Sequence, residues 1–599
     1  MFLSAKQNNS GFTLVEALVT VVIFVVIAIS IQQIFIASTQ TIRLSRLMIA
    51  SASLANEQFE IIHNLPYSDV GLLTGIPVGK LTAKKTITRD QTDFFIETTV
   101  RNIDDPFDGL IDGMPNDTSP ADYKLVELKI SVLNSERFKP MVYAETIAPK
   151  NLENSSTNGA LFIRVFNASG QPISDAGVHI ENNSTSPATL IDDVSDKDGY
   201  LRIIDVPPSF ASYKISVSKS GYSQDQTRLP GDPANPNPVK PHATVIAQTA
   251  TQISFSIDEV CSLNIQTVTE TCSPIADVDF VLKGEKIIGS EPDVLKYDQN
   301  FFTSASGDII INDLEWDTYN LTMNDDDYNL SGTNSIIPIN LLPGGSQEVK
   351  LIVASKNPRS LLVGVKQGGT NLPLSGATVK LEEASSSEEL ITGRGFLRQL
   401  DWSGGSGQEN YLDQTKYYSS NGDVETNNPA GEIKLRDIFG FYADSGELES
   451  SSFDTGSVSN FYQLYFYPQD QAPETGTDNI RLQIATNNDN SSWNFKGPDG
   501  TDGTYYTKND LNINSEHNGD RYLRYKLYLQ TASSTFTPNI SEVNFTFSSL
   551  CVPSGQVIFT GLASSSYTLT ISKDSFQTSI ENIDISLPWQ QHETILMPE

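Results

Sequence analysis

Carboxylate side chains are concentrated in one short segment that could hold a metal ion. Residues 102–122 read NIDDPFDGLIDGMPNDTSPAD, with glycine and proline at several expected turns. Because calcium prefers oxygen ligands, the segment is a candidate calcium loop, although it lacks the regular ligand alternation and terminal glutamate of an EF-hand. A solvated loop without an ion is the alternative. The segment's aspartates are Asp104, Asp105, Asp108, Asp112, Asp117 and Asp122, of which the first four are the predicted ligands.

Aromatic side chains between residues 386 and 550 form a second candidate site. Exposed rings can stack on sugars, although aromatic residues in a β-sandwich more often fill its core. The five histidines are scattered without zinc-ligand spacing. Acidic residues are so abundant that no carboxylate pair suggests a glycoside hydrolase, and no catalytic residue is predicted. The candidate ligand contacts are Trp402, Trp493, Tyr505 and Tyr506.

Glu16 lies near the start of an apolar stretch. Residues 12–36, FTLVEALVTVVIFVVIAISIQQIFI, contain an uninterrupted apolar run over residues 21–29. With its flanks this run is long enough to cross a bilayer, and no secretory cleavage site follows it. A carboxylate deep in a membrane costs about 2.5–3.5 kcal/mol and needs a partner. A newly exposed amino terminus would supply one.

Residues 11–16, GFTLVE, resemble the type IV prepilin motif. The resemblance implies that a prepilin peptidase cuts between Gly11 and Phe12 and methylates the amino group of Phe12. It also implies that Glu16, at the fifth mature position, pairs with the terminal amine of a neighbouring subunit during assembly. A plain membrane anchor with an accidental glutamate is the alternative.

The apolar stretch continues into an amphipathic pattern without proline or glycine until Pro66. Apolar residues then recur at mostly three- to four-residue spacing, which predicts one helix over residues 12–65, about 80 Å long, spanning the membrane at about 14–36. A coiled-coil stalk is the alternative. Lys6 precedes the span whereas Arg43 and Arg46 follow it, against the positive-inside tendency, so the expected orientation follows the resemblance.

The next segment, residues 66–150, has the pattern of a small β domain. Residues 80–89, 92–101, 123–133 and 141–147 carry β-branched and apolar residues between turn signals. They predict a small antiparallel sheet, as in the pilins that the motif resembles.

Three later segments share one pattern: a proline near the start of a strand, a glycine-led strand and an aromatic-led strand. They resemble carboxypeptidase-regulatory-like and collagen-adhesin B-type modules, which implies Ig-like or transthyretin-like sandwiches that act as surface spacers. Because the first strand of the first copy, residues 161–166, offers no lysine, no isopeptide crosslink is expected there. The copies cover residues 156–250, residues 251–355, and residues 356–385 together with 551–599.

Residues 386–550 interrupt the third copy. Their aromatic-rich strands predict a separate sandwich of about eight strands. The segment resembles jelly-roll modules of bacterial surface proteins, some of which bind carbohydrate.

Charge and cysteine content limit the alternatives. A net charge of −33 leaves no basic surface for phosphates, so nucleic acid is not an expected partner. The chain has three cysteines, Cys261, Cys272 and Cys551. Residues 261–272 as one strand would separate their ends by up to about 35 Å, whereas a disulfide needs Cα atoms within about 7 Å. The pairing stays open.

The sequence therefore predicts an α+β multidomain protein: a leader over residues 1–11, a long transmembrane helix with a small pilin sheet, mainly-β Ig-like sandwiches and an inserted jelly-roll-like sandwich. The expected function is a structural minor or tip subunit of a type IV pilus, in the cytoplasmic membrane and then on the cell surface. Expected partners are other pilin subunits, prepilin peptidase and membrane lipid before assembly. The alternatives are a pilus-delivered adhesin for a surface glycan or protein and a type II secretion pseudopilin.

Overall fold

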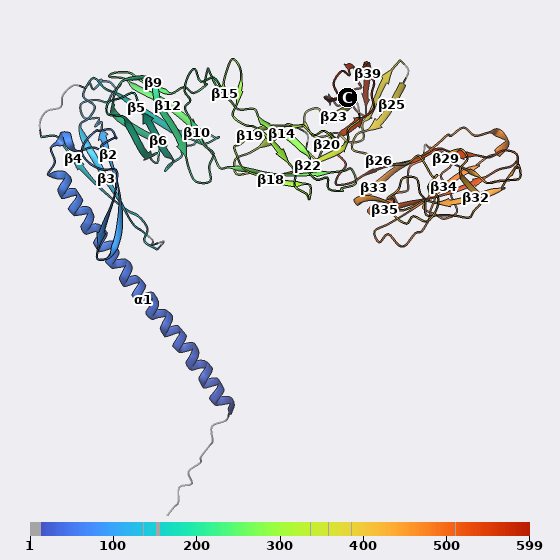
Figure 1. The fold of residues 1–599 in the computed structure, drawn as a ribbon, viewed down its shortest axis with the longest axis horizontal. Coiled ribbons are helices and arrows are strands. Elements are labelled where there is room, and N and C mark those ends of the chain that lie inside the picture. The colour runs from blue at the N-terminus through green and yellow to red at the C-terminus, as the bar shows by residue number, and fades with distance from the viewer. Residues whose placement is uncertain are drawn as a thin grey trace, which may run out of the picture. The chain divides into compact units, whose positions relative to one another are not determined.

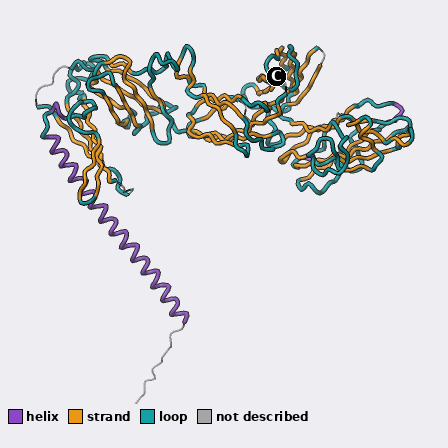
Figure 2. Tube along the Cα trace, viewed as in Figure 1, coloured by secondary structure: helices purple, strands orange, loops and turns teal. Residues whose placement is uncertain are grey.

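The computed structural model describes residues 14–133, 135, 137–150, 156–335, 337–357, 359–384, 386–509 and 511–599; the side chains of residues 16 and 17 are not described. The chain forms two compact units. Unit 1 comprises Met1–Asp258 and Ile288–Val294, and unit 2 comprises Glu259–Ile287 and Leu295–Glu599. Strands dominate both units, and one long helix stands at the start of unit 1 (Figure 2).

Helix α1 runs from Leu14 to His63, drawn in blue in Figure 1. Its 50 residues give a length of about 75 Å. It ends three residues before Pro66, whose ring cannot continue a helix. The long helix predicted from the apolar pattern is confirmed.

A four-stranded antiparallel sheet follows in the order β1-β2-β3-β4. Buried and more exposed residues alternate along β2 and β3, as expected for a sheet covered on one face. The covering element is the second half of α1, whose Leu54, Ala55 and Phe59 join one core with Phe94 and Ile96 of β2. The strands are β1 (Lys84–Arg89), β2 (Thr92–Ile103), β3 (Tyr123–Val132) and β4 (Met141–Ile147), and a 3-10 turn, η1 (Tyr67–Asp69), precedes them.

The first sandwich completes unit 1. One sheet has the order β12-β5-β8, and the other has the order β10-β9-β6-β7, with β11 also paired to β9. The strands are β5 (Gly159–Phe166), β6 (Gly177–Asn182), β7 (Thr189–Val194), β8 (Tyr200–Val206), β9 (Ser209–Ser218), β10 (Asp225–Gln226), β11 (Ala243–Val245) and β12 (Ala250–Ser256).

The second sandwich has sheets of order β18-β13-β22-β20 and β17-β14-β19-β21. A small hairpin, β15-β16, lies outside them. The strands are β13 (Cys261–Val268), β14 (Asp279–Gly284), β15 (Ile287–Gly289), β16 (Val294–Leu295), β17 (Asp298–Phe302), β18 (Asp308–Leu314), β19 (Asp317–Met323), β20 (Tyr328–Thr333), β21 (Ile339–Leu341) and β22 (Ser346–Ser355).

The third sandwich is assembled from two distant parts of the chain, in sheets of order β38-β23-β41 and β25-β24-β39-β40. Strand β25 lies in a segment that the sequence assigned to the insertion, yet it pairs with β24 throughout its length. The insertion therefore begins after residue 391. The strands are β23 (Ser360–Gln367), β24 (Thr378–Glu383), β25 (Ser386–Ile391), β38 (Gln556–Phe559), β39 (Ser566–Ser572), β40 (Ser579–Asp584) and β41 (Trp589–Leu596).

The three sandwiches share one strand topology. In each, the first strand pairs in parallel with the last strand and antiparallel with the glycine-led strand. A tyrosine corner also recurs. In each sandwich, the tyrosine of the aromatic-led strand donates its hydroxyl hydrogen to a backbone carbonyl four to six residues earlier. The repeated sequence pattern thus corresponds to a repeated three-dimensional module. The three tyrosines are Tyr213, Tyr319 and Tyr567.

The inserted domain is built around β33, which pairs with β35 through its first part and with β37 through its second. A single aromatic-rich core includes Trp402, Phe453 and Tyr525. The strands are β26 (Gly395–Gln399), β27 (Ser419–Ser420), β28 (Val424–Asn427), β29 (Ala430–Leu435), β30 (Asp437–Ile438), β31 (Phe441–Tyr442), β32 (Ser445–Glu449), β33 (Phe453–Tyr467), β34 (Ile480–Asn487), β35 (Asp520–Gln530), β36 (Asn539–Ile540) and β37 (Glu542–Ser548), with 3-10 turns η2 (Pro473–Thr475) and η3 (Ser515–His517).

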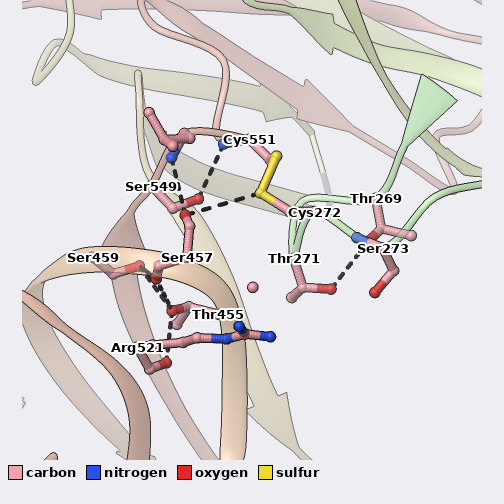
Figure 3. Close-up of a disulfide and its surroundings, with 12 residues drawn as sticks. Thr269, Thr271, Cys272, Ser273, Thr455, Ser457, Ser459, Arg521, Ser549 and Cys551 are labelled. Carbon is pink, nitrogen blue, oxygen red and sulfur yellow. Dashed lines mark hydrogen bonds between the residues drawn. A yellow bond between two sulfur atoms is a disulfide. The ribbon is translucent and has the colours of Figure 1, made fainter. Parts of the chain in front are cut away.

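A disulfide joins the second sandwich to the end of the inserted domain (Figure 3). Cys272, in the turn after β13, is bonded to Cys551, which follows β37; their Cα atoms lie 5.4 Å apart although 279 positions separate them. The backbones touch closely beside it, because a Cβ on Gly456 would lie 1.7 Å from the Thr271 carbonyl oxygen. Cys261, at the start of β13, is buried and is not part of the disulfide.

One acidic side chain lies in the same turn as the disulfide. Burial raises the pKa of the Glu270 carboxyl to about 7, and a hydrogen bond from the Phe396 backbone amide of the inserted domain opposes this rise only in part. The Phe396 amide therefore ties the Glu270 carboxyl to the inserted domain.

Candidate functional sites

Helix α1 divides into an exposed first half and a packed second half. Among the described residues, α1 is the one helix long and apolar enough to cross a membrane, and its most apolar stretch buries nothing within the chain. Phe24 is 72% exposed and Phe35 is 69% exposed. This much apolar surface is unfavourable in water, so the first half requires lipid or other subunits around it.

The residues of the predicted cleavage and assembly site stand at the start of this helix. Gly11 and Phe12 lie outside the described residues. The backbone of Glu16 lies in the first turn of α1, which begins at Leu14. The position agrees with the sequence expectation, and the roles of these three residues stay predictions.

Polar contacts fix the second half of α1 to the sheet. The hydroxyl of Tyr143 on β4 donates to Ser51 Oγ at 3.3 Å, and His63 Nε2 lies 3.0 Å from Glu145. In the segment that follows α1, the carbonyl oxygen of Val70 accepts a hydrogen bond from Lys124 Nζ at 2.6 Å. Burial lowers the pKa of Lys124 to about 8. The second half of α1 and the sheet therefore form one packed body.

The acidic loop between β2 and β3 gathers a different set of carboxylates from the one predicted. Carboxylate oxygens of Asp108, Asp117 and Asp122 all lie within 4.8 Å of one another. Of the four predicted ligands, only Asp108 belongs to this group. Asp122 also holds the backbone of Asp105 by accepting its amide hydrogen. Such a cluster has the oxygen chemistry that a calcium ion requires.

The other three predicted ligands have structural contacts of their own. Asp104 Oδ2 accepts the Ile111 amide at 3.0 Å, and burial, with the neighbouring carboxylates, raises the pKa of Asp104 to about 6. Asp105 Oδ1 accepts the Phe107 amide at 3.1 Å, and Asp112 Oδ2 accepts the Ala250 amide at 2.6 Å. Asp112 thus links the loop to the first sandwich.

The same loop lies at the boundary between the pilin sheet and the first sandwich. Ile111 is 5% exposed and packs with Ala160 and Ile204 of that sandwich. Arg101 on β2 donates from Nε to Asp193 Oδ2 on β7 at 2.7 Å. A cleft of about 1280 Å³ lies alongside these contacts. The sandwich is therefore docked on the sheet through both apolar and ionic contacts.

The predicted ligand aromatics of the inserted domain separate into buried and surface pairs. Trp402 and Tyr506 are fully buried, and Trp402 Nε1 donates to the Tyr525 hydroxyl at 2.9 Å. The expectation of ligand contact fails for these two, because a ring inside the core cannot reach a sugar. Trp493 and Tyr505 are partly exposed. Large aromatic rings fill sandwich cores because each buries about 150–250 Å².

The partly exposed aromatics cover arginines. The Arg524 guanidinium lies 4.5 Å from the Trp493 ring and 4.2 Å from the Tyr418 ring. Its Nη1 donates to Glu449 at 2.7 Å. Tyr505 covers Arg481 at 4.8 Å in the same way. One face of each ring is therefore occupied by a cation, which leaves at most the other face for a ligand.

Comparisons with known proteins match the N-terminus to a family. Residues 6–31 match the model of the prokaryotic N-terminal methylation motif. A search of curated proteins found no match. The matched residues include GFTLVE and α1 from its start at Leu14 as far as residue 31.

Solved structures give partial similarities. The Bacillus anthracis TIE protein is 12% identical, with 53% of this chain and 67% of that chain covered and a TM-score of 0.15. GBS52, the minor pilin of Streptococcus agalactiae, is 13% identical, with 33% of this chain and 96% of that chain covered and a TM-score of 0.18. The shaft pilin SpaA of Lactobacillus rhamnosus GG is 11% identical, with 33% of this chain and 98% of that chain covered and a TM-score of 0.14. Scores this low establish no shared overall fold.

The position of the methylation motif agrees with the position of the apolar helix. The motif occupies the beginning of the one described helix that could enter a membrane, and β-sheet modules follow that helix. The chain therefore carries a prokaryotic N-terminal methylation motif at the start of a long apolar helix, and β-sandwich domains follow that helix.

Proposed function

We propose that the chain is a minor or tip-located structural subunit of a type IV pilus or a related fibre. The observation that carries this proposal is the methylation motif at residues 6–31, which overlaps the start of α1, a helix whose most apolar stretch buries nothing within the chain. Before assembly this half would cross the cytoplasmic membrane once, with the sandwiches on the extracytoplasmic side. After cleavage at Gly11 by prepilin peptidase, the same half would pack among other pilin subunits, with Glu16 paired to the methylated Phe12 amine.

The fibre role can be tested on cells that have and lack prepilin peptidase. Surface fibres are sheared off and probed for this chain, whose N-terminus is determined by mass spectrometry. The expected result is a processed chain beginning at Phe12 in fibres of normal cells and unprocessed chain in the membrane of cells without the peptidase. Unprocessed chain that is absent from the fibres of normal cells would contradict the proposal.

The sandwiches serve, in this proposal, as a non-catalytic display arm. Their repeated topology places most residues in β-pairing and apolar cores. The large body beyond α1 favours a minor subunit, because a repeating one would have to pack it at every position. Partly exposed Trp493 and Tyr505 support a second role as an adhesin for a surface glycan or protein. A secretion pseudopilin would share the same N-terminal motif.

We also propose that the acidic loop binds calcium through Asp108, Asp117 and Asp122. Full-length chain in detergent, stripped with a chelator and titrated with calcium chloride, should bind one ion with Kd of about 10⁻⁴–10⁻³ M, as extracellular modules do. Asp117→Asn should weaken binding about tenfold or more, because it removes a charged ligand. Asp105→Asn is the matched control and should bind as the unchanged chain does. Equal affinity of both variants would contradict this ligand set.

A further inference from the structure

The inserted domain carries an apolar hairpin tip that faces solvent. Strands β30 and β31 pair as Asp437 with Tyr442 and Ile438 with Phe441, so Phe439 and Gly440 form the two-residue turn. Phe439 is 99% exposed, Phe441 is 58% exposed and Ile438 is 50% exposed. We name Ile438, Phe439 and Phe441 the apolar tip. Solvent-exposed apolar residues gathered in this way mark interaction sites more often than single ones do.

The turn holds Phe439 in an unfavourable backbone conformation. Phe439 has a φ of 56° and Gly440 has a φ of 91°, the pair of positive values that a type I′ turn needs. Asparagine followed by glycine suits this turn, whereas a phenylalanine with positive φ is an outlier. Neither stability nor solubility explains a large apolar ring at this position, so the outlier points to a function for the ring.

The hairpin is held in a defined position. Asp437 Oδ1 accepts the Gly440 amide at 2.7 Å, and the Tyr442 amide donates to the Ser534 carbonyl at 2.7 Å. Lys434 Nζ lies 5.9 Å from the Tyr442 ring. The apolar tip is therefore presented on an ordered support and is not a loose loop that happens to be exposed.

The chemistry of the tip favours lipid over a sugar or a protein groove. Residues 438–441 are Ile, Phe, Gly and Phe, and none of these side chains offers a hydrogen bond. Glycan and protein sites normally include precisely placed polar groups. Asp437 and Tyr442 flank the tip and Arg436 lies one residue further, so these polar groups can contact headgroups while the tip enters the acyl boundary. An apolar tip followed by an aromatic hydroxyl and by charges of both signs suits the interface of a zwitterionic bilayer.

We propose that the apolar tip inserts into the interface of a zwitterionic lipid bilayer, a function beyond that of a fibre subunit. Arg436 and Asp437 beside the tip carry opposite charges, so the tip has no excess of positive charge that would select an anionic lipid surface. Screening confines charge effects to about 8 Å at physiological salt. Binding to phosphatidylcholine should therefore persist at high salt.

The test uses the full chain with α1 held in phosphatidylcholine nanodiscs, so that only its body can contact a second membrane. Co-sedimentation with sucrose-loaded phosphatidylcholine vesicles is measured. Phe439→Asn removes the ring and gives the turn its preferred Asn-Gly sequence, so the melting temperature should stay equal or rise while vesicle binding falls about tenfold or more. Leu412→Asn is the matched control, since Leu412 is 88% exposed in the same domain but lies outside the tip.

Each result decides the proposal. Vesicle binding by the unchanged chain and by Leu412→Asn, with loss in Phe439→Asn, would support it. Absence of binding by the unchanged chain would overturn it and favour an apolar protein groove as the partner. Equal binding by Phe439→Asn, equal loss in both variants, or binding only to phosphatidylglycerol vesicles would also overturn it.

Discussion

Glu16→Ala is expected to abolish most incorporation of the chain into fibres while leaving membrane insertion and cleavage after Gly11 intact. In the proposed assembly, Glu16 neutralises the methylated amine of Phe12 in an apolar setting. Removing one partner of a buried ion pair leaves the other charge unpaired, which costs about 3–5 kcal/mol. A cost of this size corresponds to at least a hundredfold loss, which quantitative immunoblots of sheared fibres and membranes can measure.

Two variants make this result specific. Glu16→Asp keeps the charge on a shorter side chain and should retain part of the incorporation. Glu16→Gln keeps most of the shape but loses the charge, and should behave nearly as Glu16→Ala does. Normal incorporation of Glu16→Ala would remove this residue from its proposed role, and loss of cleavage in the same variant would assign it to peptidase recognition instead.

Replacing Cys272 and Cys551 together with serine is expected to lower the free energy of unfolding of unit 2 by about 2–5 kcal/mol. The bond closes a loop across 279 positions, and its removal allows the unfolded chain many more conformations. The contact between Gly456 and Thr271 should weaken, because without the disulfide this backbone contact alone would hold the inserted domain to the second sandwich at this point. Denaturant unfolding followed by tryptophan fluorescence measures the change.

Cys261→Ser is the matched control for the disulfide. Cys261 is buried near the Leu342 carbonyl oxygen, with its Sγ at 3.0 Å, and a serine hydroxyl can make the same contact. This variant should unfold within about 1 kcal/mol of the unchanged chain, the size of one ordinary hydrogen bond. An unchanged double variant, or a larger effect in the control, would show that the disulfide contributes little.

Local patterns predicted much of the fold of unit 1. The helix over residues 12–65 corresponds to α1, because a strong apolar pattern meets Pro66 at its end. The expected strands over residues 92–101 and 141–147 correspond closely to β2 and β4. Turn-forming residues lie at both ends of these strands, so a few neighbouring positions are enough to predict where each strand begins and ends.

Contacts between distant residues could not be predicted in this way. The pairing of Cys272 with Cys551 depends on how an inserted domain returns to its host module. The sequence identified Asp117 as part of the acidic loop but could not show that the loop folds back to place it beside Asp108. Trp402 was misassigned because residue type alone does not distinguish a core ring from a surface ring.

The disulfide also decides how the protein carries mechanical load. If a pulling force acts between α1 and a point on the inserted domain close to Cys551, the shortest covalent route runs from Cys551 directly to Cys272. The split third sandwich lies off that route and is not stretched. Without the bond, a load applied next to Cys551 would be carried by the chain between Cys272 and Cys551, which spans 279 positions and about 950 Å when extended at 3.4 Å per residue. In the proposed fibre subunit, the bond would therefore shorten the stretch of chain that a load near Cys551 could extend.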